Sequence, residues 1–434
     1  MPKKEKILRP KGCGLGGCFV PHLKGTAEAD TVILPPVDEV SLPLSQHIGA
    51  PAKPVVEKGQ QVFVGTLIAE SGGFVSAPVH SSVSGTVKEV TDSHIIITSD
   101  KNMTPCEDLK PFEVNTPEDL ANAAEMCGLV GLGGAGFPAK VKLTVKEGTE
   151  IDTLVVNAAE CEPYITSDYR ECMENYDDVM NGIYLIKDIL HIERAIICVE
   201  SNKDAAIKKL YEIATDTRDE DNSVQLMRLP AKYPQGAEKV LIYSATGRKV
   251  PAGKLPSDVG CIVMNITSIA TLYRFIKTGM PLVNKRITVD GTAVKEPKNI
   301  LVPIGTYIKD VLDFVGVDED YNEIIMGGPM MGIDVVSDDS PIEKRNNAIT
   351  VMKNAVPDVT TACIRCGRCA NTCPMNLYPA KVESAVNFGL YSNLNSLNVN
   401  YCMECGCCSF VCPAKRPLTQ TMRLAKAILR REKK

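Results

Sequence analysis

The chain has 434 residues, a formal net charge of −5, seventeen cysteines and no tryptophan. This length allows two to four domains with cores of their own. The acidic balance and an aromatic content of only 5% argue against nucleic acid as the main partner. No apolar run reaches the length of a transmembrane segment, and no secretory signal is visible. So many cysteines without such a signal indicate a reducing, cytoplasmic compartment.

The first segment, residues 1–30, is rich in glycine and cysteine. Cys13 and Cys18 are five residues apart and are followed by Phe19. They could be a thiol pair, a metal contact, or two small residues in a glycine loop. Since C-x4-C is a weak ligand spacing, we expect the last of these.

Residues 31–105 contain short valine- and isoleucine-rich runs separated by glycines. This pattern predicts a small barrel-sandwich hybrid module, similar to biotinyl and lipoyl carrier domains. The turn 71–76 carries no lysine to which a prosthetic group could be attached. We therefore interpret the module as structural.

Residues 115–280 alternate between apolar runs and amphipathic segments. The runs predict buried strands at 153–156, 195–199, 224–229 and 260–264. Helices are expected at 116–126, 204–214, 236–245 and 269–277. Such a layered α/β domain commonly holds a nucleotide or a flavin.

A glycine-rich stretch lies near the start of this domain. Gly131, Gly133, Gly134 and Gly136 satisfy G-x-G-x-x-G, but the residues before them indicate a helix, whereas a Rossmann turn follows a strand. Glycines still let the backbone approach an anion closely, and Lys142 adds a positive charge. We expect a phosphate-binding loop outside the Rossmann class.

Polar residues follow several of the predicted strands, where open α/β sheets bind ligands. Asn157, Glu160 and Glu162 suit ribityl or ribose hydroxyls and a ring N–H. Turn formation and local capping explain the same residues equally well. Equivalent strand-end positions are occupied by Tyr233, Gly236, Glu238, Asn265 and Thr267.

Residues 284–335 are expected to form a compact unit of ubiquitin-like size, with a strand at 286–291 and a helix at 307–315. Residues 318–360 contain the glycine loop 327–332, and we expect polar connections around it.

The last part of the chain, residues 355–434, contains one cysteine pattern twice. Both copies fit C-x2-C-x2-C-x3-C-P, which holds 4Fe–4S clusters in two-cluster ferredoxins, with the fourth cysteine of each run binding the other cluster. Structural zinc would leave the third cysteine of each copy unexplained. Cys407 stands where the first copy has Arg368, and we expect it to be no ligand. The assignment is cluster 1 with Cys363, Cys366, Cys369 and Cys412, and cluster 2 with Cys402, Cys405, Cys408 and Cys373.

The chain ends in a basic helix within 415–434, with Leu424, Ala427 and Ile428 expected on its apolar face. It could contact anionic lipid. We favour the alternative that it packs on the ferredoxin unit and exposes its basic face.

Together these strings resemble the RnfC family, the electron-input subunit of Rnf complexes, and more remotely the flavin subunit of respiratory complex I. The resemblance runs from about residue 42 to residue 426. It implies FMN at the glycine loop, NADH stacked on it, an SLBB module at 286–317, and two 4Fe–4S clusters. It implies that FMN is held by Gly131, Gly133, Gly134, Lys142, Asn157, Asn265 and Thr267. Phe137 and Glu162 would face the nicotinamide nucleotide, and the same pocket would be lined by Glu160, Tyr233, Gly236 and Glu238.

This family resemblance implies an oxidoreductase component that passes electrons from NADH through FMN and the clusters to a partner, without a general acid or a covalent nucleophile. A flavin is needed because NADH gives up a hydride, whereas each cluster takes one electron. The partner is expected to be the Rnf membrane subunits, with the chain on the cytoplasmic face of the membrane. The amino-terminal stretch departs from the family pattern at Cys18, so a soluble partner such as D-proline reductase is the alternative. A non-catalytic eight-iron relay is the second alternative.

Overall fold

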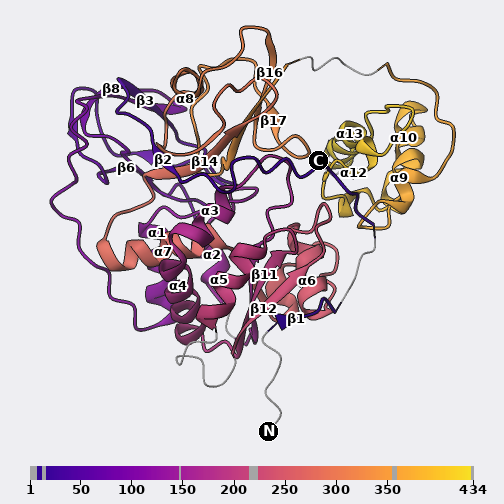
Figure 1. The fold of residues 1–434 in the computed structure, drawn as a ribbon, viewed down its shortest axis with the longest axis horizontal. Helices are drawn as coiled ribbons and strands as arrows, with labels where there is room; N and C mark the ends of the chain where they lie inside the picture. Colours follow the sequence, from indigo (N-terminus) through magenta and orange to yellow (C-terminus); the bar gives the residue numbers. More distant parts are fainter. Residues whose placement is uncertain (1–6, 12–15, 146–147, 215–222, 354–358, 432–434) are drawn as a thin grey trace.

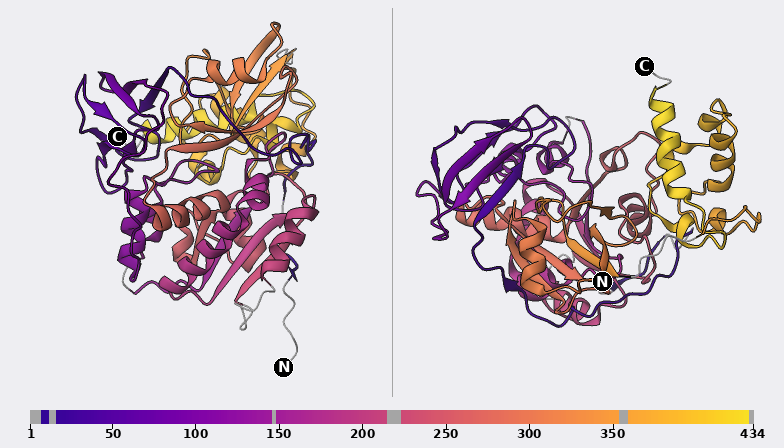
Figure 2. Two further views of the ribbon diagram at one scale, coloured as in Figure 1. Left: turned by 60° about the vertical axis from the view of Figure 1, so that its left-hand side comes forward. Right: turned by 90° about the horizontal axis from the view of Figure 1, so that it is seen from above.

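The computed structural model describes residues 7–11, 16–145, 148–214, 223–353 and 359–431. Cys13 lies outside these ranges. Figure 1 shows four units: a β module, a central α/β domain, a second α+β unit above it, and a helical unit at one side. In Figure 2 the helical unit stands beside the other three. No helix in the described ranges combines the length and apolarity needed to cross a membrane.

The β module contains two small antiparallel sheets, ordered β3-β9-β8-β5 and β4-β6-β7. Alternate residues face its core, so Ile95 and Ile97 of β9 are fully buried. The expected hybrid of short strands is present. The strands are β3 (Glu39–Pro43), β4 (Lys53–Pro54), β5 (Gln61–Val62), β6 (Leu67–Glu70), β7 (Val79–His80), β8 (Gly85–Val90) and β9 (His94–Ser99).

The central domain is built on a parallel sheet in the order β1-β12-β11-β10-β13. Its inner strands read as continuous apolar runs because helices cover both faces. Four strands were expected, whereas the edge strand β1 comes from the amino-terminal segment. The strands are β1 (Ile7–Leu8), β10 (Thr153–Ala158), β11 (Arg194–Glu200), β12 (Val224–Leu229) and β13 (Cys261–Asn265).

One face of this sheet packs against α6, through Leu241, Ile242 and Ala245. The other face packs against α4, α5 and α7. The polar helix α3 and the following α4 were not predicted. The helices are α1 (Pro117–Met126), α2 (Ala139–Leu143), α3 (Ser167–Glu174), α4 (Tyr176–Ile189), α5 (Asp204–Ala214), α6 (Glu238–Thr246), the short 3-10 turn η1 (Pro256–Val259) and α7 (Ile266–Thr278).

The α+β unit has a mixed sheet in the order β17-β16-β18-β14-β15-β2. Residues 318–360 were expected to be polar connections, and this was wrong, because β16 and β18 pair there over five positions of register. The sheet thus continues beyond residue 335. Its elements are β2 (Val32–Ile33), β14 (Asn284–Asp290), β15 (Lys298–Pro303), α8 (Ile308–Val315), β16 (Tyr321–Met326), β17 (Ile333–Asp334) and β18 (Ala348–Lys353).

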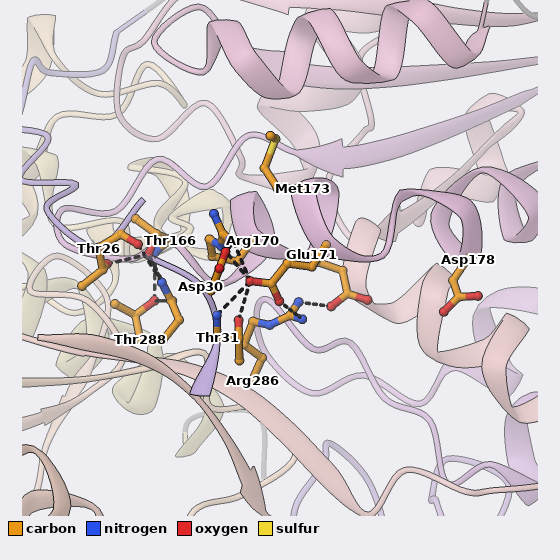
Figure 3. A network of polar contacts seen from close by, with 12 residues as sticks. Thr26, Asp30, Thr31, Thr166, Arg170, Glu171, Met173, Asp178, Arg286 and Thr288 are labelled. Atoms are coloured by element: carbon orange, nitrogen blue, oxygen red, sulfur yellow. Dashed lines mark hydrogen bonds and ion pairs between the residues drawn. The ribbon is translucent and has the colours of Figure 1, made fainter. Parts of the chain in front are cut away.

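A buried ionic network joins helix α3 to strand β14 (Figure 3). Glu171 is 2% exposed and accepts hydrogen bonds from Arg286 and, at 2.7 Å, from Arg274. Glu174 accepts a 2.8 Å bond from Arg286. Paired charges of this kind can be buried because each satisfies the other. The network explains how a polar helix is buried between two units.

The helical unit carries both cysteine runs around a small apolar core that includes Leu377, Val382 and Leu394. The basic carboxyl-terminal helix packs on this core, through Leu418, Met422, Ala425 and Leu429. The apolar face was assigned wrongly, since Leu424 and Ala427 are exposed. The elements are α9 (Arg368–Asn371), α10 (Pro379–Asn387), α11 (Asn393–Ser396), η2 (Val399–Tyr401), α12 (Cys407–Phe410) and α13 (Leu418–Arg431).

Candidate functional site

Two asparagines meet at the carboxyl edge of the central sheet. Asn157 is the last residue but one of β10 and Asn265 ends β13, and the two are register partners on adjacent parallel strands. Asn157 donates from Nδ2 to the carbonyl of Gly236 at 2.9 Å. Asn265 caps helix α7 by accepting from the backbone N–H groups of Thr267 (2.9 Å) and Ser268 (3.3 Å). The structure thus brings together four of the residues expected at the site.

Asp168, in the first turn of α3, holds this group in place and was not identified from the sequence. Its carboxylate accepts 2.7 Å hydrogen bonds from Asn265 Nδ2 and Thr267 Oγ1. Its backbone N–H donates to Glu160 Oε1 at 2.6 Å. An acidic residue early in a helix is ordinary, so nothing in the local sequence marks it. Only the tertiary arrangement shows its role.

The glycine loop 131–136 connects α1 to α2 and is closed at its base by Gly131 N–H bonding to Phe137 O at 2.9 Å. The tip, Gly133 to Ala135, is exposed. A Cβ on Gly133 would lie 2.6 Å from Asn265 Nδ2, so only glycine allows the loop to approach the strand ends this closely. This open backbone next to asparagine amides fits the phosphate and ribityl part of a flavin nucleotide.

Lys142 and Glu238 form an ion pair at 2.9 Å. Lys142 Nζ also donates to Val263 O at 3.1 Å. Both residues were expected at the site, but each was expected to face the ligand. Here the two charges neutralise one another, and both side chains are partly exposed.

Two buried carboxylates follow β10. Burial raises the pKa of Glu160 and of Glu162 to about 7. Glu162 accepts hydrogen bonds from the backbone N–H groups of Met330 (3.0 Å) and Met331 (2.9 Å), within the glycine loop 327–332. Glu160 Oε2 is buried and has no partner among the described residues. This free acceptor suits a ligand N–H or hydroxyl.

The second group of thiols surrounds a cavity in the helical unit. Its lining includes Cys402, Cys405 and Cys408 of the second run and Cys373 of the first. Among described residues, no three His, Cys, Asp or Glu side chains are arranged to hold a single metal ion. Four thiols spread around a cavity fit a multi-iron cluster.

The first group of thiols lies on the outer side of the unit, where Cys363 and Cys366 are exposed. Burial is the main cause that raises the pKa of Cys369, and nearby Cys412 and Cys363 add to it. Cys412 of the second run therefore lies near the first. Both groups fit the expectation from the sequence that the fourth cysteine of each run binds the cluster of the other run.

Tyr233 lies at the junction between the central domain and the helical unit. Its side chain is 1% exposed, and its hydroxyl donates to Cys405 O at 2.6 Å. It was expected to line the nucleotide pocket, whereas its hydroxyl is directed to the cluster loop. Cys18 pairs with it through two backbone hydrogen bonds of 2.8 and 3.0 Å. The Cys18 thiol is 3.5 Å from the Cys407 thiol, so Cys18 is more than a small residue in a glycine loop.

Four family models match successive parts of the chain. They are the RnfC barrel sandwich hybrid domain at residues 15–106, the Nuo51 FMN-binding domain at 124–274, the SLBB domain at 286–334, and the 4Fe-4S dicluster domain at 355–413. The expected fold class and the expected kinds of cofactor are thereby confirmed. The fold and the site define an electron-transfer protein of the flavin and iron–sulfur class.

Relatives match nearly the whole chain. It is 42% identical to the C subunit of the proton-translocating ferredoxin:NAD(+) oxidoreductase complex of Clostridium ljungdahlii, over 85% of this chain and 83% of the relative. It is 38% identical to the Na(+)-translocating counterpart of Acetobacterium woodii, over 95% and 96%. The chain belongs to this family, the RnfC family. An NAD+-reducing [NiFe]-hydrogenase shares the fold, with a TM-score of 0.51 and 19% identity, over 64% of this chain and 54% of that one.

Proposed function

We propose that this chain takes electrons from NADH and delivers them singly, through FMN and two 4Fe–4S clusters, to the other subunits of an Rnf-type complex. The observation that carries the proposal is the junction at Tyr233. One residue connects the strand-end loop of the flavin-binding domain to the loop that carries Cys405. A nucleotide site and an iron–sulfur unit in direct contact are suited to electron transfer between them.

The proposed FMN site uses the glycine loop for the phosphate and the strand-end amides for the ribityl chain. The loop supplies backbone N–H groups, while the charge of Lys142 is balanced by Glu238. When bound, FMN converts the hydride of NADH into two single electrons. Glu162 and Phe137 are assigned to the nicotinamide side, and Glu160 to a ligand donor. The full set is Gly131, Gly133, Gly134, Gly136, Phe137, Lys142, Asn157, Glu160, Glu162, Gly236, Glu238, Asn265 and Thr267.

The two groups of thiols differ in their surroundings, which supports an order of transfer. Cys405 lies at the junction and is buried, whereas Cys363 and Cys366 are exposed. We assign the inner site (Cys402, Cys405, Cys408, Cys373) to electrons arriving from the flavin side. The outer site (Cys363, Cys366, Cys369, Cys412) is assigned to electrons leaving for the partner.

An anaerobic preparation tests the proposal. FMN and about eight irons per chain are expected, the number that two cubane clusters contain. NADH should then bleach the iron–sulfur absorbance. In a Gly133→Ala variant, irons should stay while FMN and bleaching are lost, because a Cβ would meet Asn265. Full iron content with no bound FMN and no NADH response in the parent chain would indicate an eight-iron relay.

The partner is tested by fractionation of the native cells. The relatives are named as subunits of ion-translocating complexes, which supports membrane subunits as partners and a place on the cytoplasmic face. Co-sedimentation with membranes is then expected, with release at high salt. Recovery in a soluble complex with a reductase, such as D-proline reductase, would identify the alternative partner.

A further inference from the structure

We propose that Cys18 and Cys407 form a redox-active thiol pair that closes into a disulfide and ties the amino-terminal segment to the iron–sulfur unit. Their Sγ atoms are 3.5 Å apart, although the residues are separated by 389 positions in the chain. Neither belongs to the thiol groups assigned to clusters. The pair is therefore a site separate from the electron path described above.

The backbone around Cys18 is fixed on both sides. Gly17 N–H donates to Thr372 O at 2.6 Å, and Thr372 Oγ1 donates to Gly17 O at 2.8 Å. A Cβ on Gly17 would lie 2.6 Å from Tyr233 O, and the φ of +82° at this position favours glycine. To bond, the two Sγ atoms must close from 3.5 Å to the S–S length of about 2.05 Å.

The position of Cys407 in its run points to the same conclusion. In the first copy this position is Arg368, whose side chain is exposed, whereas Cys407 is fully buried. Cys407 lines the inner thiol cavity. Tyr233, which pairs with Cys18, also lines a second cavity of about 330 Å³ between α6 and the helical unit. The thiol pair thus borders the cluster cavity through Cys407, whereas neither thiol lines the second cavity.

The chemistry balances as a two-electron couple. Oxidation forms the Sγ–Sγ bond and releases two protons and two electrons, which hydrogen peroxide takes up to give two water molecules. Reduction returns two electrons and two protons and restores both thiols. An added dithiol supplies these electrons and is itself oxidised to a disulfide.

Mass spectrometry of the anaerobic holoprotein tests the pair. After treatment with diamide, which takes up two electrons and two protons, trapping with N-ethylmaleimide and digestion should yield one linked peptide joining Cys18 to Cys407. Dithiothreitol should remove it. Cys18→Ser and Cys407→Ser should each abolish the link and keep about eight irons, whereas the control Cys106→Ser, a thiol outside both groups, should retain it.

Three outcomes would overturn the proposal. One is the absence of a linked peptide at full iron content. Another is a link from Cys18 to a different cysteine. The third is the loss of about four irons in Cys407→Ser, since that would make Cys407 a cluster ligand. None of these outcomes depends on NADH, so a failure of the thiol pair is distinguishable from a failure of the proposed function, which is read from NADH-dependent bleaching of the iron–sulfur absorbance.

Discussion

The hydroxyl of Tyr233 donates a 2.6 Å hydrogen bond to the backbone carbonyl of Cys405. The donor follows strand β12 of the flavin-binding domain, and the acceptor belongs to the second cysteine run. Both groups are buried, so neither can exchange this partner for water. The bond therefore fixes the cluster loop relative to the edge of the sheet that carries the proposed flavin site.

Removing this hydroxyl should loosen the junction. Tyr233→Phe keeps the ring but leaves the Cys405 carbonyl without its donor, which costs about 1–3 kcal/mol. We expect a lower thermal midpoint and slower NADH-dependent cluster reduction in stopped-flow experiments. Tyr378→Phe, at a tyrosine that is 56% exposed, is the matched control and should change neither. An unchanged rate in Tyr233→Phe would show that the bond does not assist transfer.

Asp168 should control flavin affinity without contacting the isoalloxazine ring. Asp168→Asn places an amide N–H group opposite the donors of Asn265 and Thr267, so at least one of their 2.7 Å bonds is lost. We expect FMN to bind about tenfold more weakly, the equivalent of roughly 1.4 kcal/mol, with unchanged iron content. Fluorescence titration of FMN measures this. Asp188→Asn on α4 is the control, and equal affinity in both variants would remove Asp168 from the site.

The raised pKa of Glu162 should appear in the pH dependence of stability. Burial raises the pKa from 4.5 to about 7. Between these values the folded protein keeps a proton that the unfolded chain has released, so the free energy of unfolding falls as pH rises through the window. Glu162→Gln cannot titrate, and it should reduce the fall between pH 5 and pH 7 by about 2 kcal/mol. The fall should not vanish, because burial raises the pKa of Glu160 to about 7 as well.

Thermal midpoints at pH 5 and pH 7 measure this difference. The change between the two pH values is compared, since the glutamine also weakens the bonds to Met330 and Met331. Glu118→Gln, at an exposed position in α1, is the control. A pH response in Glu162→Gln as large as in the parent would show that Glu162 is ionised throughout.

The exchange of fourth cysteines predicts which cluster each substitution removes. Cys373→Ser lies in the first run but should cost the inner cluster, since Cys373 lines the inner cavity. Cys412→Ser lies in the second run and should cost the outer one. Each variant should lose about four irons. The two should differ in electron paramagnetic resonance of the remaining cluster, and the opposite assignment of spectra would disprove the exchange.

Much of the central domain could be predicted because its strands are buried on both faces. Residues Leu154 to Val156 are all apolar, and they lie within strand β10. Helix α3 could not be predicted from apolar periodicity, since Arg170 and Glu171 are buried through ion pairs. Strands β1 and β2 are two residues long, and each exists only through its partner in another unit.

The site could be predicted where a chemical motif is local. The glycine loop, the strand-end asparagines and the cysteine runs are of this kind. The role of Asp168 and the contact of Cys18 with Cys407 could not be predicted from a local motif. Each depends on segments that are far apart in the sequence. The contact of the Tyr233 hydroxyl with the cluster loop could not be predicted for the same reason. Its neighbour Cys405 is 172 residues away.

The loop at Gly17 and Cys18 contacts residues that are made much later in the chain. Thr372 follows Gly17 by 355 residues. During synthesis this loop can therefore pair with Tyr233 before it can contact Thr372 or Cys407. The order of synthesis therefore places this last contact after the whole central domain, residues 115–280, has been made.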